Sequence, residues 1–519
     1  MRKAIVGAVV VLIAAGLGWA VVEWREAPPL VPRFAPAPVE ASAKDVHTFC
    51  ALCHAYPPPE TFPRSAWREE VRKAFDFFRD ANLRYEAPDL EGVVSYYEKR
   101  APQRLPMATP ERLSRKPLPV AFVPQGLQPP QCPAVPGVTH VQLAPLFHKN
   151  KLDLIVCHTN PGRIWAVKLY EEPPTWHLLC DTVLAPCHVE AVDFDGDGHM
   201  DLLVAELGNF YPTNDRTGQV VWLRGDGRGK FTPHVLLDGV GRVADVQVAD
   251  FNGDGKLDLI VAVFGWRTGG ILYLENRTTD WAQPQFTRHV LDDRPGTIHV
   301  PVGDLNRDGK PDIVALISQE HETIVAFLNE GPLDPLNKVR FTKKTIYEAS
   351  HPAYGSSGIQ LLDLNGDGAL DVLYTNGDIL DPPYVLKPYH SIQWLENRGS
   401  FPFVHHHLAH MHGVMRAVAA DLTGAGKRDI VAVAFLPPEE YPQLKDIQAE
   451  AVLLLEQVAP GKFERHALAV ASCNHLTCAV GDVYGDGRQH LVTGNFFMTP
   501  AFAQRDLVTV WKNLGKPTK

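Results

Sequence analysis

Beyond residue 110 the chain consists of short apolar runs separated by turns rich in Gly, Asp and Asn. A typical unit has an alternating run at 188–192, an acidic loop, an aliphatic run at 202–205 and two further apolar runs at 220–223 and 231–235. Apolar runs of this length, bounded by such turns, predict β-strands. Four strand signals per unit, with little helical periodicity, predict a mainly-β body.

The acidic loop returns four times in intact form, with Asp or Asn at positions 1, 3, 5 and 9 of nine residues. Oxygen ligands at this spacing, with glycines that turn the backbone sharply, are typical of Ca²⁺ sites. We therefore expect about four Ca²⁺ ions with a structural role. The expected ligands are Asp193, Asp195, Asp197, Asp201, Asp250, Asn252, Asp254, Asp258, Asp304, Asn306, Asp308, Asp312, Asp363, Asn365, Asp367 and Asp371.

Three degenerate copies of the loop, at 145–153, 421–429 and 482–490, bring the number of units to seven. Ala425 and His490 replace expected ligands, so we expect no strong cation site in these three loops. A period near fifty residues with several strands per unit predicts a seven-bladed β-propeller. The last unit lacks a fourth strand, and residues 118–122 are expected to supply it and close the ring.

The four intact Asp-x-Asx-x-Asp-Gly-x-x-Asp loops and the turn at 263–265 resemble the FG-GAP or VCBS repeat family, which includes the integrin α-subunit propellers. The resemblance covers the chain from about residue 117 onwards and implies a propeller fold and bound calcium. The family's Gly-Ala-Pro element is absent, so no integrin-like activity is implied.

Cys50, Cys53 and His54 form a C-x-x-C-H motif, the attachment signature of covalent haem c. The alternatives are a zinc-binding pair and a thioredoxin-like redox pair. A zinc site needs further ligands, and residues 55–131 contain no other Cys or His. A redox pair needs a βαβ context, which the surrounding pattern does not provide.

Helical patterns at 65–78 and 89–99 surround this motif, and the segment resembles a monohaem cytochrome c domain. A small all-α domain is therefore expected at 44–110, before a propeller at 111–519. Met107 is the candidate sixth iron ligand. It follows the last helix, whereas common soluble cytochromes place this Met before it, so a Met in a Pro-rich linker remains the alternative.

Residues 4–22 carry no charge and follow Arg2 and Lys3. A helix of this length matches the hydrocarbon core of a bilayer, which predicts a membrane anchor at 1–25. A cleaved signal peptide is the alternative, although 16–20 offers a poor cleavage site. Basic residues stay cytoplasmic, so the soluble part is expected to face the periplasm from a bacterial inner membrane, beyond a Pro/Ala-rich spacer at 26–43.

Charge and cysteine content add two constraints. The formal net charge is −10 with 21% charged residues, which argues against a nucleic-acid partner. In an exported chain the remaining cysteines permit disulfides, but the sequence does not choose among pairings. These cysteines are Cys132, Cys157, Cys180, Cys187, Cys473 and Cys478.

The first strand of each unit is expected to line the central channel with alternate residues. The position five residues before each loop is polar in most units, whereas its neighbour is apolar. A ligand or catalytic site, a solvated lining and a protein-docking surface all remain open. The candidate site residues are His140, His188, Asp245, His299 and Arg416.

Taken together, the sequence predicts a membrane-anchored, extracytoplasmic c-type cytochrome that transfers electrons, with a propeller that recognises a small-molecule substrate or a redox partner protein. Two alternatives remain. In one, the propeller is a dehydrogenase that passes electrons to the haem. In the other, it is a non-catalytic binding or adhesion module, for protein or polysaccharide, with a haem sensor.

Overall fold

The computed structural model describes residues 39–108, 112–130, 134–265, 267–332, 339–380, 384–499 and 505–516. The expected membrane anchor at 1–25 lies outside these residues, as does most of the spacer. Within the described ranges no helix is both long enough and apolar enough to cross a membrane.

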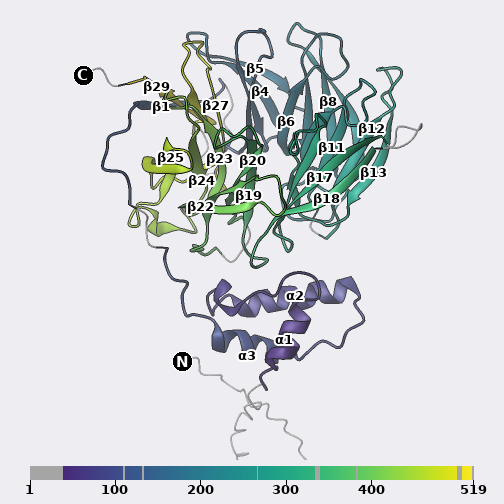
Figure 1. Ribbon diagram of the computed structural model, residues 1–519, viewed down its shortest axis with the longest axis vertical. Helices are drawn as coiled ribbons and strands as arrows, with labels where there is room; N and C mark the ends of the chain where they lie inside the picture. Colours follow the sequence, from purple (N-terminus) through teal and green to yellow (C-terminus); the bar gives the residue numbers. More distant parts are fainter. Residues whose placement is uncertain are drawn as a thin grey trace, which may run out of the picture. The chain divides into compact units, whose positions relative to one another are not determined.

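Seven antiparallel sheets form a seven-bladed β-propeller, as predicted (Figure 1). The first four blades are β2 (Val138–Ala144), β3 (Asp153–His158), β4 (Arg163–Lys168) and β5 (Thr175–Cys180); β6 (Pro186–Val192), β7 (Asp201–Glu206), β8 (Gly218–Gly225) and β9 (Phe231–Val240); β10 (Val243–Ala249), β11 (Asp258–Val263), β12 (Gly270–Asn276) and β13 (Phe286–Asp292); and β14 (Thr297–His299), β15 (Val302–Gly303), β16 (Asp312–Ile317), β17 (Thr323–Pro332) and β18 (Val339–Glu348). The last three are β19 (Ser356–Leu362), β20 (Asp371–Asn376), β21 (Ser391–Glu396) and β22 (Val404–His410); β23 (Val414–Ala420), β24 (Asp429–Ala434), β25 (Glu450–Ala459) and β26 (Lys462–Val470); and β27 (His475–Gly481), β28 (His490–Asn495), β29 (Val508–Asn513) and β1 (Phe122–Leu127).

The two ends of the propeller meet in the seventh blade, where β1 pairs with β29 from Phe122 opposite Asn513 to Leu127 opposite Val508. Closure of the ring is therefore as predicted, but the expected strand at 118–122 begins only at its last residue. In the preceding segment Val120 is packed, at only 4% exposed, and Ala121 exchanges backbone hydrogen bonds with Leu514 and Gly515 beyond the end of β29. The seventh sheet therefore has four strands, and β1 serves as its outer strand.

The core lies between neighbouring blades. The second strand of each blade is buried along its whole length, because it has a strand on both sides and a blade on both faces. The first strands alternate as predicted: Val141, Val189, Val246 and Val300 are at most 3% exposed, whereas the residues before them face the channel.

The fourth blade departs from this regular pattern. Its first strand is split into β14 and β15 at Pro301, which has no backbone N–H to donate. The preceding N–H of Val300 bonds instead to the carboxylate of Asp245 in the third blade, at 2.9 Å. This break ties the channel ends of the two blades together.

The N-terminal described segment contains α1 (Ala43–Cys50), η1 (Pro59–Thr61), α2 (Trp67–Ala81) and α3 (Leu90–Arg100), and a second short 3₁₀ helix, η2 (Pro442–Leu444), lies in the sixth blade. The three α-helices surround an aromatic core in which the rings of Trp67 and Tyr97 stack at 3.8 Å. Asp89 caps α3 by accepting from Gly92 N at 2.8 Å. The helix expected from residue 65 begins at Trp67, after Ala66, and no side chain caps it.

Candidate functional site

The acidic loops join the first and second strands of each blade, on what we call the loop face. In each intact loop the first Asp accepts backbone N–H groups of the loop, as where Asp250 Oδ2 accepts from Gly255 N at 2.9 Å. Gly255 has a φ of +84°, which favours glycine. The loops therefore hold their acidic side chains in one repeated backbone arrangement.

The ninth residue of the loop ties it to the rest of the blade. Asp312 is fully buried, and its carboxylate accepts from Leu305 N at 2.9 Å and from Asn329 N at 2.8 Å. Burial raises the pKa of the equivalent Asp258 to about 7 and that of Asp371 to about 6. The ninth position is therefore a structural bridge from the loop to the end of the third strand.

The first intact loop differs from the other three. The carboxylates of Asp193, Asp195 and Asp197 gather within 4.8 Å of one another, and Arg224 of β8 lies 2.6 Å from Asp195 Oδ2. The other loops have Asn at the third position, and its amide donates to the fifth-position Asp, as from Asn252 Nδ2 at 3.2 Å. The first loop thus concentrates the most negative charge.

In the degenerate seventh loop, His490 replaces the ninth Asp and keeps part of its role. Its Nδ1 accepts from Asn513 N at 3.0 Å, and its Nε2 lies 3.0 Å from Asp486 Oδ1. Asp482, Asp486 and His490 gather closely, although we expected no strong site here. Because Nδ1 accepts an N–H, the proton of a neutral ring lies on Nε2 and donates to Asp486.

Three carboxamides in or directly after the third strand of their blades are functional contacts that the loop spacing does not predict. Asn329 Nδ2 donates to Phe251 O and Asn397 Nδ2 to Leu305 O, both at 3.0 Å. Asn513 donates likewise to Leu422 O at 2.8 Å. These side chains fasten the fourth, fifth and seventh blades to the loop of the blade before each, and the recurrence of Asn near the end of the third strand is the signal in the sequence.

The channel brings together candidate residues from three blades at one level. His188 Nε2 of β6 lies 3.1 Å from Asp245 Oδ1 of β10, and His299 Nδ1 of β14 lies 3.7 Å from Asp245 Oδ2. Asp245 is only 2% exposed. Burial alone raises its pKa, but His188, His299 and the N–H of Val300 outweigh burial and hold the pKa of Asp245 below its ordinary value.

Further polar groups surround this centre. The ring of His140 lies 4.3 Å from that of His188, and its buried Nε2 has no hydrogen-bond partner among the described residues. Glu190 lies 3.9 Å from His188 Nε2, and burial, followed by the charge of Asp245, raises the pKa of Glu190 to about 7. Burial lowers the pKa of both His140 and His188, so their rings are neutral near pH 7.

Arg416 of β23 belongs to the same column. It donates to Ile359 O at 3.1 Å, and its charge adds to burial in lowering the pKa of His140. The equivalent residues in the fifth and seventh blades, Gly358 and Thr477, bring no charge. The titratable side chains of the channel therefore come mainly from the first four blades, on one side of the ring.

The C-x-x-C-H motif lies at the end of α1. Cys50 and Cys53 are both free thiols, the first partly buried and the second exposed. His54 Nδ1 lies 2.8 Å from Ala55 O, which fixes the proton on Nδ1 and leaves the Nε2 lone pair available. Met107 is 52% exposed. No disulfide joins the cysteines of the described ranges, and Cys132 lies outside them.

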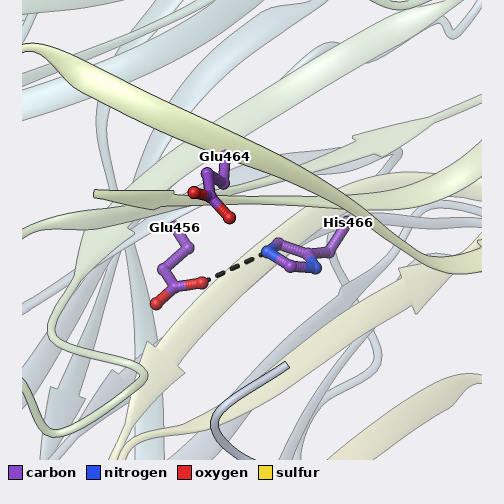
Figure 2. Close-up of side chains that lie close together, drawn as sticks. All are labelled: Glu456, Glu464 and His466. Atoms are coloured by element: carbon purple, nitrogen blue, oxygen red, sulfur yellow. Dashed lines mark hydrogen bonds and ion pairs between the residues drawn. The ribbon is translucent and has the colours of Figure 1, made fainter. Parts of the chain in front are cut away.

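A further cluster lies on the sixth blade, where Figure 2 shows Glu456, Glu464 and His466 turned toward one another. His466 Nε2 lies 3.2 Å from Glu456 Oε2. Glu464 accepts from Ser114 Oγ at 2.8 Å and pairs with Lys116. The charge of Glu464 is already matched, so this cluster fastens the segment before β1 to the propeller.

Comparison with known proteins supports the propeller. Residues 193–261 and 304–374 match the FG-GAP-like repeat, and these two stretches contain all four intact loops. No curated protein matches the chain. Two similar solved structures are crystal structures of BBS1N in complex with ARL6DN, soaked with lead or with mercury; they are 12% and 11% identical, have TM-scores of 0.42 and 0.41, and cover 76% and 78% of this chain and 98% of that chain. Similarity to FG-GAP-like repeats is thus found in the two stretches that contain the intact loops.

Proposed function

We propose that the propeller is a recognition module whose ligand binds at the channel end of the first strands. The observation that carries this proposal is the His188–Asp245–His299 cluster, which three blades build and which no other blade repeats. Buried titratable groups that converge in a channel are typical of binding sites. The FG-GAP-like repeats support a binding role for the fold as a whole.

The test is a thermal-shift screen of sugar acids, neutral oligosaccharides and amino acids on the calcium-loaded protein. A ligand of the channel should raise the melting temperature of wild type and lose this effect in His299→Ala and Arg416→Ala. His289→Ala, on the outer strand β13, is the matched control. Hits that bind all variants equally would place recognition elsewhere, and a partner protein that binds without small-molecule hits would favour docking.

A second candidate function, electron transfer by a covalent haem c, is favoured by the geometry at the end of α1. Two unpaired thiols precede a histidine whose Nδ1–H is held by a backbone carbonyl, the arrangement that directs Nε2 to a metal. Cys50 and Cys53 would hold the porphyrin covalently and His54 would ligate iron, which supplies one-electron chemistry. Phe49, whose ring lies 4.7 Å from that of Phe75, would supply apolar packing.

This proposal requires an extracytoplasmic location, because cytochrome c maturation takes place there, and it fits the apolar N-terminal run expected to anchor the chain in a membrane. Protein matured in a host that assembles c-type cytochromes should show a Soret band and keep its haem on a denaturing gel. Cys50→Ala/Cys53→Ala should lose both, and Cys478→Ala should keep both. Colourless wild-type protein would reject the haem while leaving the recognition proposal intact.

If both proposals hold, two arrangements can be distinguished. Reduction of the haem by a small molecule, lost in His299→Ala, would make the propeller a dehydrogenase domain. Reduction by a partner protein alone would make it a docking module.

A further inference from the structure

The channel cluster has the composition of a transition-metal site rather than of a solvated lining. Each member of the cluster has a nitrogen or oxygen atom that can donate a lone pair, less than four ångströms from such an atom of a neighbour. His188 Nε2 lies 3.1 Å from Asp245 Oδ1 and 3.9 Å from Glu190 Oε2. His299 Nδ1 lies 3.7 Å from Asp245 Oδ2. Two imidazoles and two carboxylates form the donor set that divalent zinc and its neighbours prefer.

One of the separations fits a shared ion as it stands. Ligand atoms about 2.0–2.2 Å from one ion lie roughly 3.0–3.4 Å apart at the edges of tetrahedral or octahedral sites. The distance between His188 Nε2 and Asp245 Oδ1 falls in that range. Glu190 and His299 lie farther from their neighbours, and among the described residues the groups of three donor atoms within 4.8 Å of one another lie elsewhere, so these two side chains must move to reach a shared ion. His299 has room to move, since 24% of its side chain is accessible.

His188 Nε2 faces two polar side chains of the neighbouring blade. It lies 3.1 Å from both the carboxylate of Asp245 and the amide nitrogen of Gln247. Without a metal ion, a proton on Nε2 satisfies this arrangement, because the ring donates to Asp245 and Gln247 Nε2 donates to Asp245 Oδ1 at 3.2 Å. A divalent ion would replace that proton at the Nε2 lone pair and leave the hydrogen bond from Gln247 to Asp245 intact.

A second observation points to an absent ligand. His140 Nε2 is buried beside His188 and has no hydrogen-bond partner among the described residues. An unpaired buried imidazole nitrogen costs free energy unless a ligand or water satisfies it.

We propose that His188, Asp245, His299 and Glu190 bind one divalent first-row transition-metal ion in the propeller channel, with His140 facing the ion's remaining ligand. A role for this ion in recognition rests on the proposed function of the propeller. Binding of the ion to the channel does not depend on that function. The ion is distinct from the calcium expected at the loop face, since imidazole nitrogen is a poor ligand for Ca²⁺.

The test is calorimetric titration of the full metal-stripped chain with Zn²⁺, in excess Ca²⁺ so that the acidic loops stay occupied. We expect one class of site with a stoichiometry of one that Asp245→Asn weakens at least tenfold. The carboxamide oxygen of this variant can still accept from Val300 N, so the fold should persist, and circular dichroism checks this. His188→Gln provides a second variant should Asp245→Asn unfold.

His289→Ala, near Glu275 on the outer surface, is the control and should bind Zn²⁺ as wild type does. X-ray absorption at the zinc edge should show a nitrogen and oxygen shell that loses imidazole scattering in His188→Gln. Zinc binding unchanged by both channel variants, or no binding at all, would overturn the proposal. Metal binding without any hit in the ligand screen would leave the metal site standing and refute the recognition role alone.

Discussion

The loop face and the channel of the propeller both concentrate acidic and polar side chains. They differ in how far these side chains repeat from blade to blade. At the loop face the second to sixth blades repeat one arrangement, in which a buried ninth residue bonds the backbone of its own loop and of the third-strand region. The first and seventh blades keep part of it, through Asp153 and His490. In the channel the equivalent position varies between blades: it is His in three of them, Asp245 in the third, and Gly358, Arg416 and Thr477 in the last three.

The contrast separates structural from functional polarity. A group that every blade repeats satisfies a requirement that every blade has, namely closing its loop and contacting its neighbour. A buried group present in only some blades satisfies no common requirement, and it carries a desolvation cost that folding alone does not explain. Recognition is therefore proposed for the channel and stability for the loop face.

The largest test of this contrast is calcium removal. If the intact loops bind Ca²⁺ only in the folded state, an ion present at a hundred times its Kd stabilises the fold by about 2.7 kcal/mol per site. EGTA treatment should therefore lower the melting temperature strongly, and Ca²⁺ should restore it. The channel variant His299→Ala should keep this response in full. A melting temperature indifferent to EGTA on metal-stripped protein would contradict calcium at the loop face.

The ninth position should matter even without calcium. Asp312→Ala leaves two buried N–H groups, of Leu305 and Asn329, without their acceptor. At about 1–3 kcal/mol each, the free energy of unfolding should fall by about 2–6 kcal/mol. Asp308→Ala, more exposed in the same loop, is the control for calcium-free protein. Equal effects of the two variants in urea unfolding would show that the bridge is not structural.

The carboxamides between blades predict a smaller effect. Asn397 Nδ2 donates to Leu305 O in the preceding blade and to Leu370 O in its own. Asn397→Ala leaves these buried carbonyls unpaired and should lower the free energy of unfolding by about 1–3 kcal/mol. Arg398→Ala removes an exposed ion pair with Glu396 and should cost at most about 1 kcal/mol. A control variant as damaging as Asn397→Ala would refute the fastening role.

The sequence predicted these features unevenly, for physical reasons. The acidic loops and the alternation of the first strands arise from local spacing, so counting back from each loop located His188, Asp245 and His299. The contacts of Asn397 depend on a residue 92 positions away, which spacing within one unit does not reveal. The start of β1 was misplaced because an apolar run predicts burial equally well for packed and paired segments.

The last prediction depends on pH and compares the two ends of one strand. β7 begins at the loop face with Asp201, which accepts from Gly225 N, and ends with Glu206, which is 3% exposed. Burial raises the pKa of Glu206 to about 7 from the ordinary 4.5. Between these values the folded state keeps a proton that the unfolded chain has released, so stability falls as the pH rises.

Glu206→Gln removes this dependence, because the amide has no proton to release. Below about pH 4.5 the free energy of unfolding should vary with pH in the same way in wild type and variant. Between about pH 4.5 and pH 7 the wild type should lose up to about 3 kcal/mol of this free energy relative to the variant. Urea unfolding of both proteins at pH values on either side of this window measures the difference, with the exposed Glu440→Gln as control. If the variant keeps the slope of wild type, the buried carboxyl at the channel end is ionised at no cost, and a cation or ligand must be compensating its charge.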